Sequence, residues 1–254
     1  MSAAPTLREW LGADRFALTM SSGFFGFFAH AGVLSVLEDE GLVPVRLSGS
    51  SAGALVAGTW AAGLDAAALA RELLVLRRAD FWDPTPGAGL LAGRLFRTRL
   101  ESLLPARSFA ACRAPLAVSV YDLARGKTRV LTHGDVAAAI HASCAVPVLF
   151  QPVWHDGGLL VDGGVLDRPG LLGMPSGERV LYHHLSSRSP WRRRGSPSLS
   201  IPRRAGLTAL VLDGLPRVGP FRLPMGKLAF ERARAATRTA LETRVSDGVV
   251  RLVA

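Results

Sequence analysis

Residues 43–62, VPVRLSGSSAGALVAGTWAA, carry the strongest structural signal in this chain of 254 residues. The stretch begins with a short apolar run that predicts a strand, and the small residues at 52–62 predict a helix packed closely against a sheet. Between them lies a G-x-S-x-G pattern formed by Gly49, Ser51 and Gly53. A serine on a sharp strand-to-helix turn is held in a strained conformation, and glycines on either side allow close backbone approach. The pattern therefore predicts a hydroxyl beside a helix N-terminus, where backbone N–H groups stabilise developing negative charge.

The same five residues also have a simpler interpretation. In a chain with 27 glycines, Ser50 or Ser51 could accept a backbone hydrogen bond as a helix N-cap, with the glycines serving only tight packing. Only Ser51 is centred between the two glycines. We therefore take Ser51 as the nucleophile candidate and leave the N-cap alternative open.

Strand and helix patterns alternate along the chain, which predicts an α/β fold with three α/β/α layers around a mainly parallel central sheet. Strands are predicted at 16–20, 43–47, 115–121, 127–132, 159–162 and 179–185, the last taken as the final core strand. Helices are predicted at about 27–41, 52–62, 65–78, 135–146 and 226–245. Pro and Gly interrupt the segment 80–105, which predicts an irregular excursion.

We expect a single domain over residues 1–254, with a motif-bearing core at about 16–170 and a C-terminal extension at 186–254. The extension begins with a basic loop rich in Ser and Pro at 186–204, which indicates an exposed segment. It ends with the amphipathic terminal helix, which could cover a site, pack on the core or form a dimer.

Composition narrows the class of protein. Hydrophobic residues make up 49% of the chain and charged residues 20%, which predicts a sizeable folded core. The formal charge of +10 favours anionic partners such as phospholipid headgroups. The many arginines occur together with many Ala and Gly residues, a composition typical of a GC-rich genome. The positive charge is therefore weak evidence for nucleic-acid binding, and no nucleic-acid partner is expected. Without an apolar leader or a run of roughly 18 apolar residues, the sequence predicts a cytoplasmic protein with peripheral membrane contact at most. Cys112 and Cys144 are expected to be free thiols, and no metal-ligand spacing is present.

A second glycine-bearing loop, 21–26 (SSGFFG), directly follows the predicted strand at 16–20 and precedes a helix. Such a loop can present backbone N–H groups to an anion, either a dinucleotide pyrophosphate or a tetrahedral oxyanion. A dinucleotide loop would have glycine in place of Ser21, and its acidic partner would end a strand, whereas the acidic residues at 38–40 lie in a helix. The dinucleotide interpretation is therefore poor, which leaves either an oxyanion or a simple tight turn that places Phe25, Phe27 and Phe28 in the core.

Two Asp-Gly-Gly triplets begin at Asp156 and Asp162. Asp156 has the surroundings of a hairpin turn. Asp162 instead ends an apolar run, so its carboxylate could reach a group on a neighbouring turn. A chain order of Ser51, Asp162 and then His183 or His184 would suit a triad, but both histidines lie in a predicted strand, where they would face opposite sides. The strand placement counts against the triad without settling what partners Ser51, and we expect His30 to be a packed structural residue.

Taken in order, these motifs resemble the patatin-like phospholipase family from about residue 16 to about residue 169. The family's A-H-x-G-V-L is matched by 29–34, its G-x-S-x-G by 49–53, its A-S-x-x-x-P and F-x-P-V by 142–147 and 150–153, and its D-G-G by 162–164.

The resemblance implies a serine lipid acyl hydrolase of the phospholipase A, lysophospholipase or carboxylesterase type, without a cofactor. Ser51 and Asp162 would form its catalytic dyad, acting through an acyl-enzyme intermediate. Its oxyanion hole would be formed by backbone N–H groups at Ser22, Gly23 and Phe24. The remaining motif glycines are Gly26, Gly49, Gly53, Gly163 and Gly164.

The chain departs from the family at the oxyanion loop, which is usually G-G-G-x-R-G. Ser21 and Ser22 replace two glycines, which would strain the loop if those positions need a positive φ, and Phe25 replaces the arginine. The loss of that cation favours neutral or lightly charged esters, although Arg192–Arg194 in the basic loop could compensate. The alternative is a catalytically impaired protein of this fold that binds lipid or a protein partner.

Overall fold

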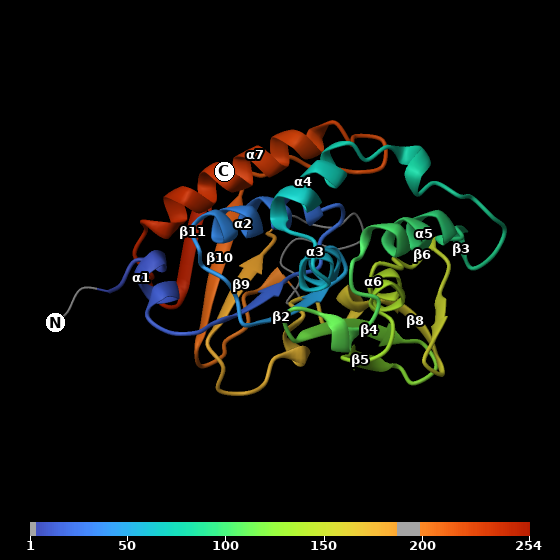
Figure 1. The fold of residues 1–254 in the computed structure, drawn as a ribbon, viewed down its shortest axis with the longest axis horizontal. Coiled ribbons are helices and arrows are strands. Elements are labelled where there is room, and N and C mark those ends of the chain that lie inside the picture. Colours follow the sequence, from blue (N-terminus) through green and yellow to red (C-terminus); the bar gives the residue numbers. More distant parts are fainter. Residues whose placement is uncertain (1–3, 187–198) are drawn as a thin grey trace.

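The computed structural model describes residues 4–186 and 199–254. The strands of its main sheet are β1 Ala17–Met20, β2 Arg46–Ser50, β4 Leu116–Asp122, β5 Lys127–Leu131, β7 Val153–His155, β8 Gly158–Asp162, β9 Val180–His184, β10 Leu207–Asp213 and β11 Val249–Val253. Their order within the described residues is β11-β10-β9-β1-β2-β4-β8-β7, with β5 also paired to β4 (Figure 1). Neighbours from β11 to β4 are parallel, whereas β5, β7 and β8 pair antiparallel. The predicted α/β class with a mainly parallel central sheet is confirmed.

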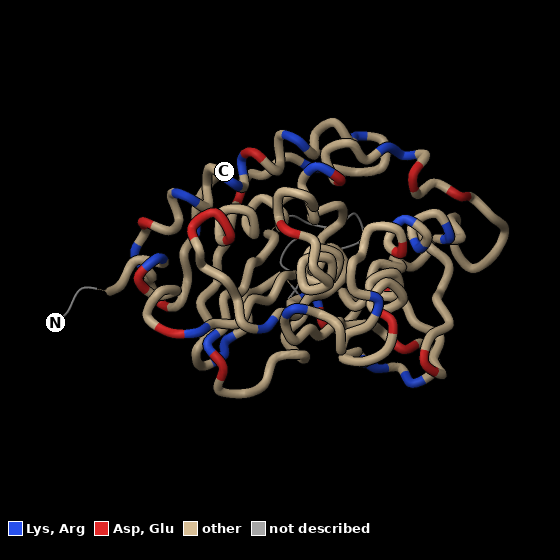
Figure 2. Tube along the Cα trace, in the orientation of Figure 1, with Lys and Arg blue, Asp and Glu red and all other residues tan. Residues whose placement is uncertain are grey.

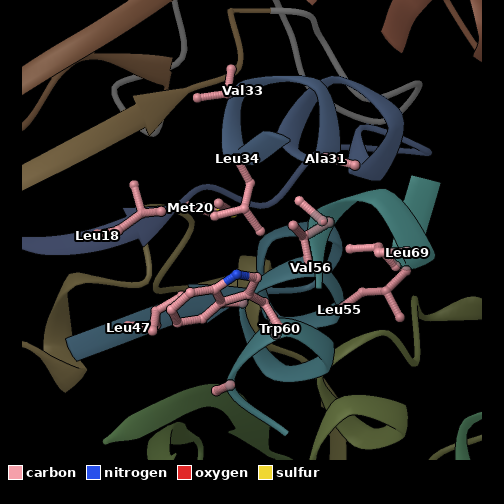
Figure 3. Close-up of a cluster of buried hydrophobic side chains, with 14 of the residues drawn as sticks. Leu18, Met20, Ala31, Val33, Leu34, Leu47, Leu55, Val56, Trp60 and Leu69 are labelled. Atoms are coloured by element: carbon pink, nitrogen blue, oxygen red, sulfur yellow. The ribbon is translucent and has the colours of Figure 1, made fainter. Parts of the chain in front are cut away.

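Helices cover one face of this sheet. They are α1 Leu7–Gly12, α2 Phe27–Asp39, α3 Ala52–Ala61, α4 Ala66–Leu74, α5 Arg94–Leu103, α6 Val136–Ser143 and α7 Met225–Leu241. Alternate residues of the strands, such as Leu18 and Met20, enter one hydrophobic cluster with Leu34 of α2 and Trp60 of α3 (Figure 3). Among the helices that the structure describes, none is both long and apolar enough to cross a bilayer.

The opposite face of the sheet is covered by the segment 163–179, which contains the short 3₁₀ helices η3 Gly163–Val165 and η4 Leu171–Gly173. The hydroxyl of Ser48 donates to the carbonyl of Gly170 at 2.6 Å, and the hydroxyl of Thr19 donates to the carbonyl of Pro169 at 3.0 Å. These bonds satisfy polar strand residues that are buried beneath the segment.

The terminal helix α7 packs along α2 (Figure 1). The two backbones approach so closely that a Cβ at Gly32 would lie 2.6 Å from the carbonyl oxygen of Phe230. The sequence left open whether the terminal helix covers a site, packs on the core or forms a dimer, and in the structure it packs on the core.

The structure differs from the sequence-based prediction in three places. β2 lies at 46–50 instead of 43–47, the segment 80–105 contains α5 and the strand β3 Gly89–Leu91, and β10 and β11 follow the strand predicted to be last. β3 pairs in parallel with β6 Val148–Phe150 in a separate small sheet. Most of the predicted basic loop, 187–198 with Arg192–Arg194, lies outside the described residues.

Substitution of Gly53 should destabilise the fold, because its α-carbon faces the backbone of β1. An alanine Cβ there would lie 2.0 Å from the carbonyl oxygen of Met20, so one of the two chains must shift. We expect Gly53→Ala to lower the free energy of unfolding by about 1–3 kcal/mol in urea titrations. Gly12→Ala is the matched control, because no atom lies within 4 Å of its added Cβ and stability should stay level or rise. Equal stabilities of the two variants would contradict this account.

Candidate active site

The carboxyl ends of β2 and β8 meet on a single edge of β4. A strand has two edges, and β5 pairs with Val118–Asp122 along one of them. β2 and β8 must therefore share the other edge, where Ser50 pairs with Ser119 and Asp162 pairs with Val120. Since Ser119 and Val120 are consecutive, the two strands point at each other and end side by side. This register brings Ser51 and Asp162 to the same place.

Ser51 occupies the sharp turn that the sequence predicted. Its φ of 53° and ψ of −118° are strained for a residue with a side chain. A Cβ at Gly49 would lie 2.5 Å from the backbone nitrogen of Ala54, so this glycine does allow close approach. The Ser51 side chain accepts no hydrogen bond from the first turn of α3, all of which the structure describes. The hydroxyl of Ser50 finds no hydrogen-bond partner among the described residues. Both observations argue against the N-cap alternative.

The C-terminal end of α6 holds the backbone of this turn in place. The N–H of Ser51 donates to the hydroxyl of Ser143 at 2.9 Å, and that hydroxyl donates to the carbonyl of Ser119 at 2.7 Å. The Sγ of Cys144 lies 3.3 Å from the carbonyl oxygen of Ser51. Burial and the carboxylate of Asp162 raise the pKa of the Cys144 thiol well above its usual value, so the thiol stays protonated. Sequence reasoning noted residues 142–147 as a motif but missed this supporting function of Ser143.

Asp162 is the last residue of β8 and is almost fully buried. Its Oδ1 accepts the N–H of Gly164 at 2.7 Å, and its own N–H donates to the carbonyl of Ala145 at 2.9 Å. Gly163 has no room for a side chain, because a Cβ there would lie 2.1 Å from the carbonyl oxygen of Ser119. These contacts fix the carboxylate at the junction of the two strands.

The loop 21–26, which the sequence predicts to be an oxyanion loop, differs from expectation at two positions. The N–H of Ser22 donates to the carbonyl of Arg168 at 2.7 Å, so this predicted oxyanion donor is already occupied within the protein. The sequence predicted backbone strain at Ser21 and Ser22. The residue of this loop with a positive φ is instead Phe25, whose φ is 53°. The Phe25 ring packs against Phe27 and Phe81, with centroids 5.4 and 5.8 Å away.

Arg168, which the sequence analysis did not single out, links the oxyanion loop to the segment that follows Asp162. This arginine is buried, and its guanidinium donates to the carbonyl of Leu185. The N–H of Leu185 in turn donates to the hydroxyl of Ser21 at 3.0 Å. No sequence motif predicts this arrangement, because it depends on contacts between residues that are far apart in the chain.

The histidines bind one another and their neighbours instead of forming a triad. His30 Nε2 lies 2.8 Å from the carbonyl oxygen of Ser21, and the Nδ1 atoms of His30 and His183 are 2.7 Å apart. His184 Nδ1 lies 2.9 Å from the hydroxyl of Tyr182. Burial lowers the pKa of His30 to about 3 and that of His184 to about 4, so both are neutral at neutral pH. The expectation that His30 is a packed structural residue is confirmed.

Ser51 and Asp162 line one pocket, together with Gly23, Phe24 and Gly164. A second cavity, which shares Ser51, Gly23 and Phe24 with the first, runs beneath α4 and α5. Leucine and phenylalanine side chains dominate its lining: Phe25, Leu55, Leu69, Leu73, Phe81, Phe96, Leu100 and Leu103. Its charged lining residues Glu72 and Arg99 form an ion pair at 2.9 Å. The described residues contain no group of three or more His, Cys, Asp or Glu side chains placed to hold a metal ion.

The model of the family Patatin, described as patatin-like phospholipase, matches residues 18–173 of this chain. The chain belongs to the patatin-like phospholipase family. The match includes Ser51, Asp162 and the loop 21–26, whereas β9 and Leu185 lie beyond its end. The resemblance seen in the ordered motifs is thereby confirmed.

Known proteins are similar to parts of this chain, which spans less than half the length of the curated relatives it matches. It is 35% identical over 158 residues to Rv1063c, an uncharacterized NTE family protein of Mycobacterium tuberculosis, covering 61% of this chain and 44% of the relative. It is 33% identical over 161 residues to Rv2565, another uncharacterized NTE family protein of the same organism, covering 59% of this chain and 26% of the relative. VipD from Legionella pneumophila is similar in fold, with a TM-score of 0.54, 15% identity, and coverage of 78% of this chain and 50% of VipD.

The buried histidines make stability depend on pH. In the unfolded chain His30 would bind a proton below about pH 6.5, whereas in the fold its pKa is about 3. Protons therefore favour the unfolded state, and each such histidine lowers the unfolding free energy by up to about 1.4 kcal/mol per pH unit as the pH falls from about 6.5. Denaturation between pH 7.5 and 5 should show a shallower slope for His30→Gln. A slope for His30→Gln equal to that of the wild type would contradict this account.

Proposed function

We propose that this protein is a serine hydrolase that cleaves acyl esters of lipids, with Ser51 as nucleophile and Asp162 as its base. The observation that carries the proposal is the register on β4, which delivers a strained serine and a buried carboxylate to one pocket. Family membership supports the same chemistry.

In this proposal Asp162 accepts the proton of the Ser51 hydroxyl as its oxygen attacks the ester carbonyl. The alcohol leaves with that proton, and an acyl-enzyme remains on Ser51. Water, activated by Asp162, then releases the fatty acid. A carboxylate is a far weaker base than the alkoxide it would help to form, so stabilisation of the oxyanion must supply much of the rate. The N–H groups of Gly23 and Phe24 remain the proposed donors, without that of Ser22.

The apolar cavity supports a single acyl chain as the group that is bound next to Ser51. Its lining is almost entirely hydrocarbon, and the Phe25 side chain contributes to it where the family usually has an arginine. A phosphate group would therefore find no cation from this loop position. We propose that neutral esters are preferred to phosphate-bearing ones of equal chain length.

A second candidate function is lipid binding without catalysis. The bond between the Ser22 N–H and the Arg168 carbonyl favours it, because one fewer donor is available to an oxyanion. The two functions differ in whether Ser51 reacts with an acylating reagent.

Ser51→Ala and Asp162→Asn should each reduce hydrolysis of p-nitrophenyl acyl esters by roughly 10⁴-fold or more, because each removes one partner of the dyad. Ser50→Ala is the matched control, since this neighbouring buried hydroxyl lies outside the lining of the Ser51 pocket and should leave the rate nearly unchanged. A fluorophosphonate probe should label the wild type and fail to label Ser51→Ala. An inert wild type would support the second candidate function instead.

Leu73 offers a test of the acyl cavity. It is buried and lines the cavity, whereas the next residue on α4, Leu74, is 41% exposed. Leu73→Trp should lower kcat/KM for a dodecanoyl ester by about tenfold while sparing a butyryl ester, because the larger ring fills space that a long chain would occupy. Leu74→Trp should leave both values unchanged. An unaltered chain-length profile in Leu73→Trp would place the acyl chain elsewhere.

A further inference from the structure

Apolar side chains stand exposed around the mouth of the Ser51–Asp162 pocket. Val148 and Val165 line the pocket, and they are 81% and 38% exposed. Leu166, which follows Val165, is 62% exposed, and Leu90 in the strand paired with Val148 is 49% exposed. We call these four residues the apolar rim. Large aliphatic side chains gathered at one opening mark an interaction surface more often than scattered ones do.

The backbone fixes the most exposed member of the rim in an unfavourable conformation. Val148 has a φ of 70°, which is an outlier for a β-branched residue. The parallel pairing of β6 with β3 holds it there, opposite Gly89. Such strain costs stability and persists where the surrounding structure dictates it, often at functional sites.

The stretches that carry the rim contain no charged residue. Residues 84–93, 142–153 and 163–166 lack Asp, Glu, Lys and Arg, in a chain in which charged residues make up 20% of the total. In Figure 2 the chain around β3 is drawn in tan, the colour of residues other than Lys, Arg, Asp and Glu. A surface of this composition can leave water for an apolar phase without the cost of desolvating a charge.

We propose that the apolar rim is the surface on which this protein lies against an aggregate of neutral or zwitterionic lipid. The rim is continuous with the pocket and, through Ser51, with the apolar cavity, so an acyl chain leaving the lipid layer would pass Ser51 and Asp162 on a path whose two ends are apolar. A protein partner bound at the rim would instead block the entry of an acyl chain, which favours lipid as the occupant. This inference rests on the proposed function for its choice of lipid as the occupant. Since the rim is uncharged, binding should depend little on anionic lipid or salt.

The test measures binding of the full chain to phosphatidylcholine vesicles by sedimentation, in the Ser51→Ala background so that turnover does not interfere. Leu90→Asp and Leu166→Asp should each weaken binding by about tenfold, because a carboxylate must be desolvated at the lipid surface. Val253→Asp is the matched control, since Val253 is 85% exposed on the outermost strand β11 and should bind as the parent does.

A second variant separates the surface from the fold. Val148→Gly removes an apolar side chain at a φ that glycine adopts freely, so the thermal midpoint should stay level or rise while vesicle binding falls. Hydrolysis of a monomeric butyryl ester by Leu90→Asp and Leu166→Asp, with Ser51 present, should stay within about twofold of wild type.

Three results would overturn the inference. The first is equal binding by the rim variants and Val253→Asp. The second is binding by the parent only to anionic vesicles with strong salt dependence. The third is a dimer in light scattering that the rim variants dissociate, which would make a second copy the occupant. Each result is read without catalysis, so failure of the Ser51–Asp162 dyad and failure of the rim are distinguishable.

Discussion

One edge of β4 serves two strands that run in opposite directions, and the geometry of the site depends on this pairing. β2 ends against Ser119 and β8 ends against Val120, so neither chain can continue in the sheet. Each must turn out of the sheet immediately, and the residues at those turns are Ser51 and Asp162. The hydrogen bonds of the sheet thus set the separation of the two side chains.

Crowding at this junction explains the glycines around it. Gly49, Gly53 and Gly163 each face backbone atoms within 2.6 Å of where a Cβ would stand, so a methyl group at any of them would displace a neighbouring chain. The serine bears the strain instead, with a positive φ held by Ser143 and the end of α6. Hydrogen bonds from the surrounding structure offset a local conformational cost that the turn cannot avoid.

The sequence predicted the elements whose signals are local. The turn at Ser51, the strand ending on Asp162 and the hairpin at Asp156, whose φ is 47°, were all found as expected. β2 was placed too early because its second half, Ser48 to Ser50, is polar by composition. Those residues are buried all the same, and the hydroxyl of Ser48 is satisfied by the Gly170 carbonyl, a partner 122 residues away.

Other features depend on contacts that no local pattern contains. α5 was missed because the prolines and glycines before it suggested an irregular segment, although its own residues are amphipathic. The occupied N–H of Ser22 and the buried Arg168 follow from the packing of the segment after Asp162 against the oxyanion loop. Their positions are set by tertiary structure, so only coordinates reveal them.

The hydrophobic core extends beyond the part of the chain that the family model matches. The shared region ends at residue 173, yet β1 has its second edge paired with β9, and the outer side of α2 is covered by α7. Without residues 174–254, an unpaired central strand and an apolar helix face would both meet water. The matched region is therefore not a complete folding unit, because residues 174–254 supply the strand and the helix that cover its open edge and face.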